Sequence, residues 1–187
     1  MTSKGVLVLV LVLMATGGVF AQNWYDSYAP GLENNSFFIN GGIGWGPTGG
    51  YNMGIPPISV SVDFKLPIDL PITVGAIGTY STWKYSSPYY TYRYEVTYTN
   101  IGIGGRGMWH FNFMPNLDVY AGLTIGYVIQ NSSVTSGSAY DYNAGNSFFL
   151  WGFNAGARYF FTNAIGAYAE LGYSGLQYAS IGVTFKF

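Results

Sequence analysis

The chain has 187 residues, a formal net charge of -1 and no cysteine. Charged residues make up 8% of it, against about 25% in typical globular chains, whereas aromatic residues reach 19% and glycines number 27. The charge balance gives no electrostatic basis for binding nucleic acid, and the absence of cysteine excludes disulfides and thiol catalysis. So few charges cannot cover the water-facing surface of an ordinary soluble domain.

The first 21 residues predict a secretory signal peptide. Lys4 precedes the apolar run 6–14, and the small residues Val19 and Ala21 follow it, as at a signal-peptide cleavage site. The run is well short of the roughly 20 apolar residues that a membrane-spanning helix needs. We therefore expect export, cleavage before Gln22, and a mature chain that starts with an arm, residues 22–35, in the periplasm.

From residue 36 onward, apolar residues alternate with polar or small ones, which is the period of a β-strand. No later apolar run approaches the length of a spanning helix, and the only other structure that satisfies every backbone group in lipid is a closed barrel. Residues 36–187 are therefore predicted to form an all-β, eight-stranded, antiparallel up-and-down transmembrane barrel. The predicted strands are 36–45, 57–66, 70–83, 92–113, 117–130, 146–161, 164–174 and 177–187.

The connections between these strands alternate in length. Long stretches at 46–56, 84–91 and 131–145 alternate with tight turns at 67–69, 114–116 and 162–163. Outer-membrane barrels place long loops outside the cell and short turns in the periplasm. The last connection, 174–176, should be long by this rule and is short.

Seven charged residues of the predicted strands fall on the less apolar face, where they avoid lipid. A cationic side chain facing lipid at mid-depth costs about 2–4 kcal/mol, and a soluble lipocalin-like barrel would show the opposite pattern. Because eight strands leave a lumen that side chains fill, these residues are candidates for ion pairs inside the barrel. Arg106 and Glu170 are predicted to lie at similar depth and to meet, with Arg158 nearby. The candidates are Asp63, Lys65, Arg106, Asp118, Arg158, Glu170 and Lys186.

The last eight residues carry a motif, Ser-Ile-Gly-Val-Thr-Phe-Lys-Phe, with Gly182, Phe185 and Phe187 at its marked positions. The motif is similar to the terminal signal of the small eight-stranded outer-membrane barrels typified by OmpX, OmpW and the membrane domain of OmpA. This resemblance implies location in a bacterial outer membrane and handover to the barrel-assembly machinery. Because the sequence stops at Phe187, we expect no peptidoglycan-binding domain, and we expect a monomer surrounded by outer-membrane lipid.

Residues 102–107 match G-x-G-x-x-G, but alternating residues and then Pro115 follow instead of the helix that a dinucleotide site needs. Some barrels of this size are lipid enzymes that use a histidine with a serine and an acid near the outer surface. The only histidine, His110, lies close to the 114–116 turn, which we place at the periplasmic end. We therefore predict no enzyme activity, and neither a cofactor nor a histidine-based metal site.

A tyrosine-rich stretch, residues 80–98, has two interpretations. Part of it fits the aromatic girdle at the outer headgroups. Its tip offers the exposed contact candidates Lys84, Tyr85, Tyr89 and Tyr90 to an extracellular ligand.

Three functions remain open from the sequence. The preferred one is a barrel with a plugged lumen and exposed loops, whose role is structural or in surface interaction. The second is OmpW-like passive uptake of small apolar solutes, for which inward glycines such as Gly122 and Gly152 leave some room. The third, disfavoured by the position of His110, is a lipid-modifying enzyme.

Overall fold

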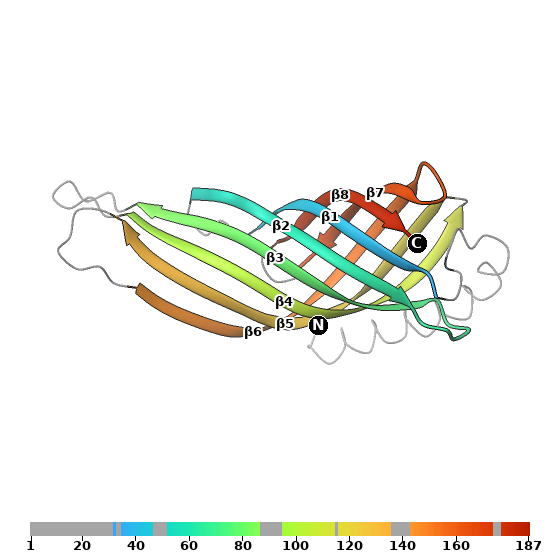
Figure 1. Ribbon diagram of the computed structural model, residues 1–187, viewed down its shortest axis with the longest axis horizontal. Coiled ribbons are helices and arrows are strands. Elements are labelled where there is room, and N and C mark those ends of the chain that lie inside the picture. The colour runs from blue at the N-terminus through green and yellow to red at the C-terminus, as the bar shows by residue number, and fades with distance from the viewer. Residues whose placement is uncertain are drawn as a thin grey trace, which may run out of the picture.

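The computed structural model describes residue 32 and residues 35–46, 52–86, 95–114, 116–135, 143–173 and 177–187. Each strand pairs antiparallel with its neighbours in the chain, and β1 pairs with β8, so that the sheet closes on itself (Figure 1). The predicted eight-stranded antiparallel barrel is therefore confirmed. The strands are β1 (Phe37–Trp45), β2 (Asn52–Lys65), β3 (Ile72–Ser86), β4 (Glu95–Met114), β5 (Leu117–Thr135), β6 (Asn143–Phe160), β7 (Ile165–Gly172) and β8 (Ala179–Lys186). Within these described residues, no helix is long and apolar enough to cross a membrane.

The strand register shows how far the strands tilt. We start at Gly42 on β1 and step from each residue to its paired residue on the next strand. Through β2, β3, β4 and β5, these steps reach Phe148 on β6. Starting again at Gly42 and stepping the other way round the barrel, through β8 and β7, the paired residues reach Arg158, also on β6. One circuit therefore shifts the register by the ten residues between Phe148 and Arg158. A stagger of this kind accompanies a strand tilt of roughly 35–45°.

The wall of the barrel is uneven in height. β4, β5 and β6 have 20, 19 and 18 residues, whereas β7 and β8 have 8 each. Figure 1 shows β2 to β6 projecting beyond β1, β7 and β8 at the end away from the C-terminus. We call this projecting part the outer extension.

The predicted loops 46–56 and 131–145 are shorter in the structure because the strands that flank them continue, and the predicted loop 84–91 is shifted to 87–94. β2 begins at Asn52, β3 runs to Ser86, and β5 and β6 extend to Thr135 and from Asn143. The predicted boundaries at 57, 83, 130 and 146 were wrong because the alternation of apolar and polar residues ends before the backbone pairing does. In the outer extension the two faces no longer differ consistently in polarity, and the alternation disappears although the ladder goes on.

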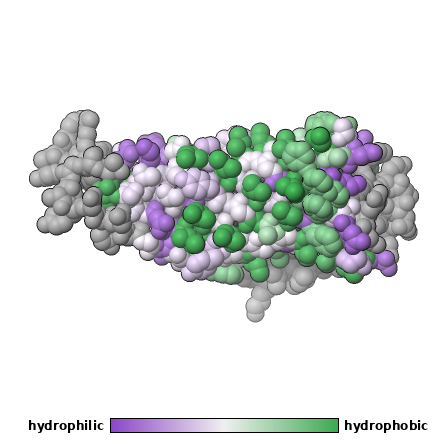
Figure 2. All heavy atoms as spheres, in the orientation of Figure 1, coloured by the Kyte–Doolittle hydropathy of each residue, from purple (hydrophilic) through white to green (hydrophobic). Residues whose placement is uncertain are grey.

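The outward face carries a continuous apolar band. Figure 2 shows apolar side chains gathered over the middle of the barrel and toward the C-terminal end, with hydrophilic residues toward both ends. Members of the band on six strands include Val60, Val62, Val74, Ile103, Leu123, Ile125, Phe153, Ile181 and Val183, all more than 40% exposed. Exposed apolar residues of this extent indicate a surface that faces something other than water.

Aromatic side chains border the band on both sides. The border toward the outer extension includes Trp45, Tyr80, Tyr127 and Trp151, and the opposite border includes Tyr159, Phe161, Phe185 and Phe187. Farther from the C-terminus, the outward positions of β4, β5 and β6 include the polar residues Thr97, Asn131, Ser133 and Ser147. Aromatic rings at these two levels are typical of membrane–water interfaces.

The inward face is mostly polar, and its apolar residues form small clusters. Near the turn end, Leu32 from the segment before β1 packs with Phe38 and Phe160. On β5 and β6, Val128 and Leu150 form a second cluster. Between these two levels lies a group of buried charges.

Candidate functional site: a buried charged network in the lumen

Asp63 on β2 joins two arginines, Arg106 on β4 and Arg158 on β6. Its Oδ1 lies 3.0 Å from Arg106 Nε, and its Oδ2 lies 2.5 Å from Arg158 Nη2. All three side chains are at most 2% exposed. Because β2, β4 and β6 are not neighbours in the sheet, these ion pairs cross the lumen.

Glu170 on β7 forms one end of the network. Its Oε2 accepts hydrogen bonds from Arg106 Nη2 at 2.9 Å and from the Tyr120 hydroxyl at 3.0 Å. Its Oε1 accepts one from Asn154 Nδ2 at 2.5 Å. Both carboxylate oxygens are thus satisfied away from water, which a buried carboxylate requires.

His110 and Asp118 form the other end, nearer the turns. Asp118 Oδ2 lies 3.3 Å from Arg158 Nη1, and its Oδ1 lies 2.7 Å from His110 Nδ1. His110 Nε2 lies 2.9 Å from Thr73 Oγ1. The contacts therefore run without a break from Thr73 on β3 to Glu170 on β7, and we call this set the lumen network.

Arg158 also lies between two aromatic rings. Its guanidinium carbon is 4.6 Å from the centre of the Phe38 ring and 4.4 Å from that of Tyr120. A guanidinium on ring faces gains cation–π attraction, which is larger when water is excluded. The rings and the two carboxylates together fix the position of this charge.

The remaining lumen candidates lie outside these contacts. Lys65 is buried, and its Nζ donates to the carbonyl oxygens of Leu66 at 2.6 Å and Ile68 at 2.9 Å in the β2–β3 turn. Lys186 is half-buried at the turn end of β8, on the inward face beside Phe38. Lys65 thus stabilises a turn, and Lys186 lies at the rim of the lumen.

The terminal motif and the loop candidates lie apart from the network. Gly182 is on the inward face at the seam between β1 and β8, while Phe185 and Phe187 face outward in the aromatic border, where Phe187 stacks on Phe37 with ring centres 4.9 Å apart. The exposed loop candidates Lys84 and Tyr85 are strand residues of β3, and Lys84 forms an exposed ion pair with Glu95 at 3.0 Å. Tyr89 and Tyr90 lie outside the described residues.

Sequence reasoning missed the neutral members of the network. These are Asn40, Thr73, Tyr120 and Asn154, all at most 3% exposed. Asn40, for example, donates to Asp63 Oδ2 at 3.0 Å and to Ser61 Oγ at 2.8 Å. The alternation along each strand shows that these four residues face inward. It does not show which inward residues lie at the same depth in the lumen.

The order Thr73, His110 and Asp118 matches the hydrogen-bond order of a nucleophile, a base and an orienting acid. All three side chains are at most 1% exposed, which leaves a substrate no access to the hydroxyl in this structure. The described part of the chain also holds no group of three histidine, cysteine or acidic residues placed to bind a metal. The arrangement is therefore that of a satisfied buried histidine.

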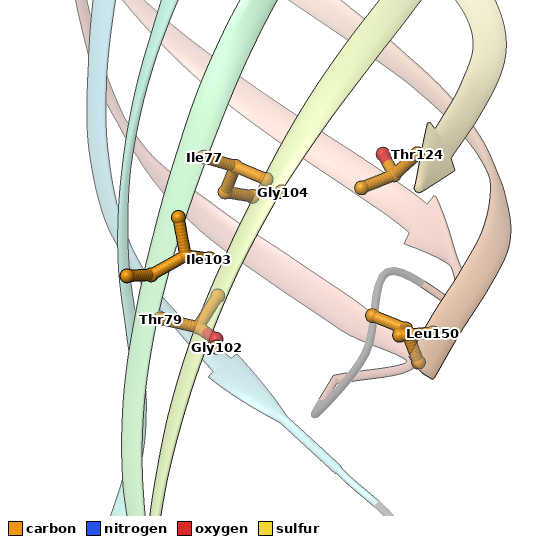
Figure 3. A pocket seen from close by; sticks show the side chains of 7 residues that line it. All are labelled: Ile77, Thr79, Gly102, Ile103, Gly104, Thr124 and Leu150. Atoms are coloured by element: carbon orange, nitrogen blue, oxygen red, sulfur yellow. The ribbon is translucent and has the colours of Figure 1, made fainter. Parts of the chain in front are cut away.

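Farther toward the outer extension, a small cavity lies inside the wall. Figure 3 shows its lining, which comes from β3, β4, β5 and β6: Ile77, Thr79, Gly102, Ile103, Gly104, Thr124 and Leu150. It has room for about one water molecule. Gly102 and Gly104 of the G-x-G-x-x-G stretch thus lie within strand β4 and line a space too small for a nucleotide.

No protein-family model and no curated protein matches the chain. Among solved structures it is similar to Ail, the attachment invasion locus protein of Yersinia pestis, in complex with the heparin analogue sucrose octasulfate, with 12% identity over 83% of this chain and 100% of that chain and a TM-score of 0.48. The N-terminal β-barrel domain of Pseudomonas aeruginosa OprF gives 19% identity, 82% and 98% coverage and a TM-score of 0.42. Neisserial surface protein A gives 14% identity, 82% and 95% coverage and a TM-score of 0.42.

Proposed function

We propose that this chain is an integral protein of a bacterial outer membrane, reached after export and removal of residues 1–21, with a lumen plugged by side chains and a structural or surface-interaction role. The observation that carries the proposal is the inverted distribution of polarity. The band exposed on the outside is apolar, whereas charged side chains are buried inside. A barrel surrounded by lipid requires this distribution.

The plug is supported by the reach of the lumen network across the barrel. Its ion pairs and hydrogen bonds join side chains from β2, β3, β4, β5, β6 and β7, and Phe38 of β1 covers Arg158. An ion that entered would have to separate pairs that lie 2.5–3.3 Å apart and would leave buried charges without partners. Breaking a buried pair in this way costs roughly 3–5 kcal/mol.

The surface role is supported by the outer extension. Its outward positions include the polar residues Thr97, Asn131 and Ser133, and the Lys84–Glu95 pair links the outer ends of β3 and β4. We assign contact with an extracellular ligand to Lys84, Tyr85, Tyr89 and Tyr90. At the opposite end, Gly182, Phe185 and Phe187 serve as the signal to the barrel-assembly machinery.

Single-channel recording tests the plug. The chain is refolded into planar lipid bilayers as the native sequence and as the double variant Arg106→Ala/Glu170→Ala, which removes one lumen pair. We expect the native barrel to be silent and this variant to pass current. The matched control is Lys84→Ala/Glu95→Ala, which removes an ion pair of similar length, 3.0 Å, on the exposed surface and should stay silent.

Steady current through the native barrel would contradict the plug and favour passive uptake instead. Current through the control as well as the lumen variant would show that the effect comes from a general loss of structure. A circular dichroism spectrum of each refolded variant, compared with that of the native barrel, separates this case from the opening of a path.

A further inference from the structure

The seam where β1 meets β8 contains a gap on its inward face. Gly42 and Gly182 are opposite each other in the register, between the pairs Asn40–Thr184 and Gly44–Ser180. Both glycines have inward parity. At this level of the seam, neither strand contributes a side chain to the lumen.

Tyr168 of β7 occupies the gap. It is paired with Gly182 in the β7–β8 register and is 7% exposed. A Cβ placed on Gly182 would collide with the Gly41 carbonyl oxygen and lie 2.7 Å from Tyr168 Cε1. A Cβ on Gly42 would collide with both the Ile181 carbonyl oxygen and the Tyr168 hydroxyl oxygen. The ring therefore extends from β7 over β8 and reaches β1.

The hydroxyl of Tyr168 extends the contact to a fourth strand. It also interacts with the side chains of Ser59 on β2 and Ser180 on β8. One side chain thus touches β8, β1 and β2 from its place on β7. The β7–β8 pair is local in sequence, whereas Gly42 and Ser59 come near Tyr168 only when the first and last strands have met.

We propose that Tyr168, seated over the glycine pair Gly42 and Gly182, is a lock that holds the β1–β8 seam closed. The lock forms only on closure, so its loss acts on the rate at which the closed barrel opens. Gly182 then has a steric reason to be glycine that is independent of any part it has in assembly.

The test measures the unfolding rate of refolded protein in lipid vesicles, by dilution into urea. Tyr168→Phe, which loses only the hydroxyl, should unfold about fivefold faster than the native chain. Tyr168→Ala, which also loses the ring, should unfold on the order of a hundredfold faster. Because Tyr168→Phe keeps the ring in its seat, it gives a result even if Tyr168→Ala does not refold.

A seam disulfide distinguishes a lock from ordinary packing. The chain has no cysteine, and Gly41 and Val183 are paired on the outward face of the seam, so Gly41→Cys/Val183→Cys introduces a single cross-link away from Tyr168. With the disulfide formed, the Tyr168 variants should unfold at nearly the rate of the cross-linked native chain. The control disulfide Ala76→Cys/Gly105→Cys, between β3 and β4, should leave the differences unchanged.

If the Tyr168 variants unfold faster by the same factor with the seam disulfide as without it, the ring stabilises β7 or β8 locally and the lock is overturned. Unfolding rates equal to that of the native chain in both Tyr168→Phe and Tyr168→Ala would also overturn it.

Discussion

Arg158 lies fully buried between two carboxylates and two aromatic rings. Arg158→Met keeps much of the side-chain volume but removes a cationic partner from both Asp63 and Asp118. Asp63 is then left with Arg106, and Asp118 with His110. We expect the free energy of unfolding to fall by roughly 3–5 kcal/mol, because a buried charge that loses its partner keeps its desolvation cost. Equilibrium urea unfolding in lipid vesicles, followed by tryptophan fluorescence, measures this change.

The control for this prediction is Lys84→Met, which breaks an ion pair whose side chains are 45% and 37% exposed. Solvent screens such a pair, so the expected change is within about 1 kcal/mol. Equal losses in the two variants would mean that burial of the lumen network contributes nothing beyond a surface ion pair.

Among the elements, β1 and β6 are joined on the inward face by Leu32, which precedes β1 in the chain. This side chain is 3% exposed and packs against Phe38 and Phe160 beneath the lumen network. Leu32→Ala should lower the free energy of unfolding by about 2–4 kcal/mol, because it removes buried apolar volume. Leu70→Ala, in the β2–β3 turn where the side chain is 47% exposed, should change it by less than about 0.5 kcal/mol.

The same urea titration compares the loss of unfolding free energy in Leu32→Ala with that in Leu70→Ala. A Leu32→Ala value as small as that of Leu70→Ala would show that the segment before β1 adds no stability to the barrel.

The sequence predicted the number, order and facing of the strands because lipid outside and a polar lumen inside impose a strict period of two. In β2, for example, Val60 and Val62 face outward while Ser61 and Asp63 face inward, as expected. The ends of β3, β5 and β6 were not predictable in this way, since Lys84, Ser133 and Gly145 pair in the ladder where no lipid enforces a pattern.

For the network, parity identified the inward charges, and equal distance from the turns predicted that Arg106 and Glu170 meet, which their 2.9 Å ion pair bears out. It did not predict that Asp63 joins both arginines. The contacts of Asp63 with both arginines depend on the stagger between strands. That stagger is set by all eight strand pairings together, so it cannot be read from the sequence of any single strand. Thr73 and Asn154 were missed for the same reason, because only depth separates them from other inward polar residues.

At the scale of the whole molecule, the apolar band and the outer extension predict where lipid ends. Ser133→Cys and Ile125→Cys place single thiols on the outward face of β5, eight residues apart by their numbers, in a chain without cysteine. On intact cells, a membrane-impermeant maleimide should label Ser133→Cys and leave Ile125→Cys unlabelled, because the second thiol lies in lipid. The readout is the shift of the band on a denaturing gel.

Thr162→Cys, in the β6–β7 turn, is the control for orientation. It should react only after the outer membrane is permeabilised, because the proposed orientation places the turns in the periplasm. Labelling of Thr162→Cys on intact cells together with protection of Ser133→Cys would reverse the orientation, and labelling of all three would place the chain outside the membrane.

The uneven height of the wall also bears on the bilayer itself. The eight residues of β7, at about 3.3 Å per residue and a tilt near 40°, rise only about 20 Å, less than the roughly 25 Å apolar band usual for outer-membrane barrels. On the opposite side, β4 and β5 exceed that height. In the outer membrane proposed above, we expect the lipids beside β7 and β8 to shorten or tilt their chains to match, so that the barrel thins the membrane on one side only.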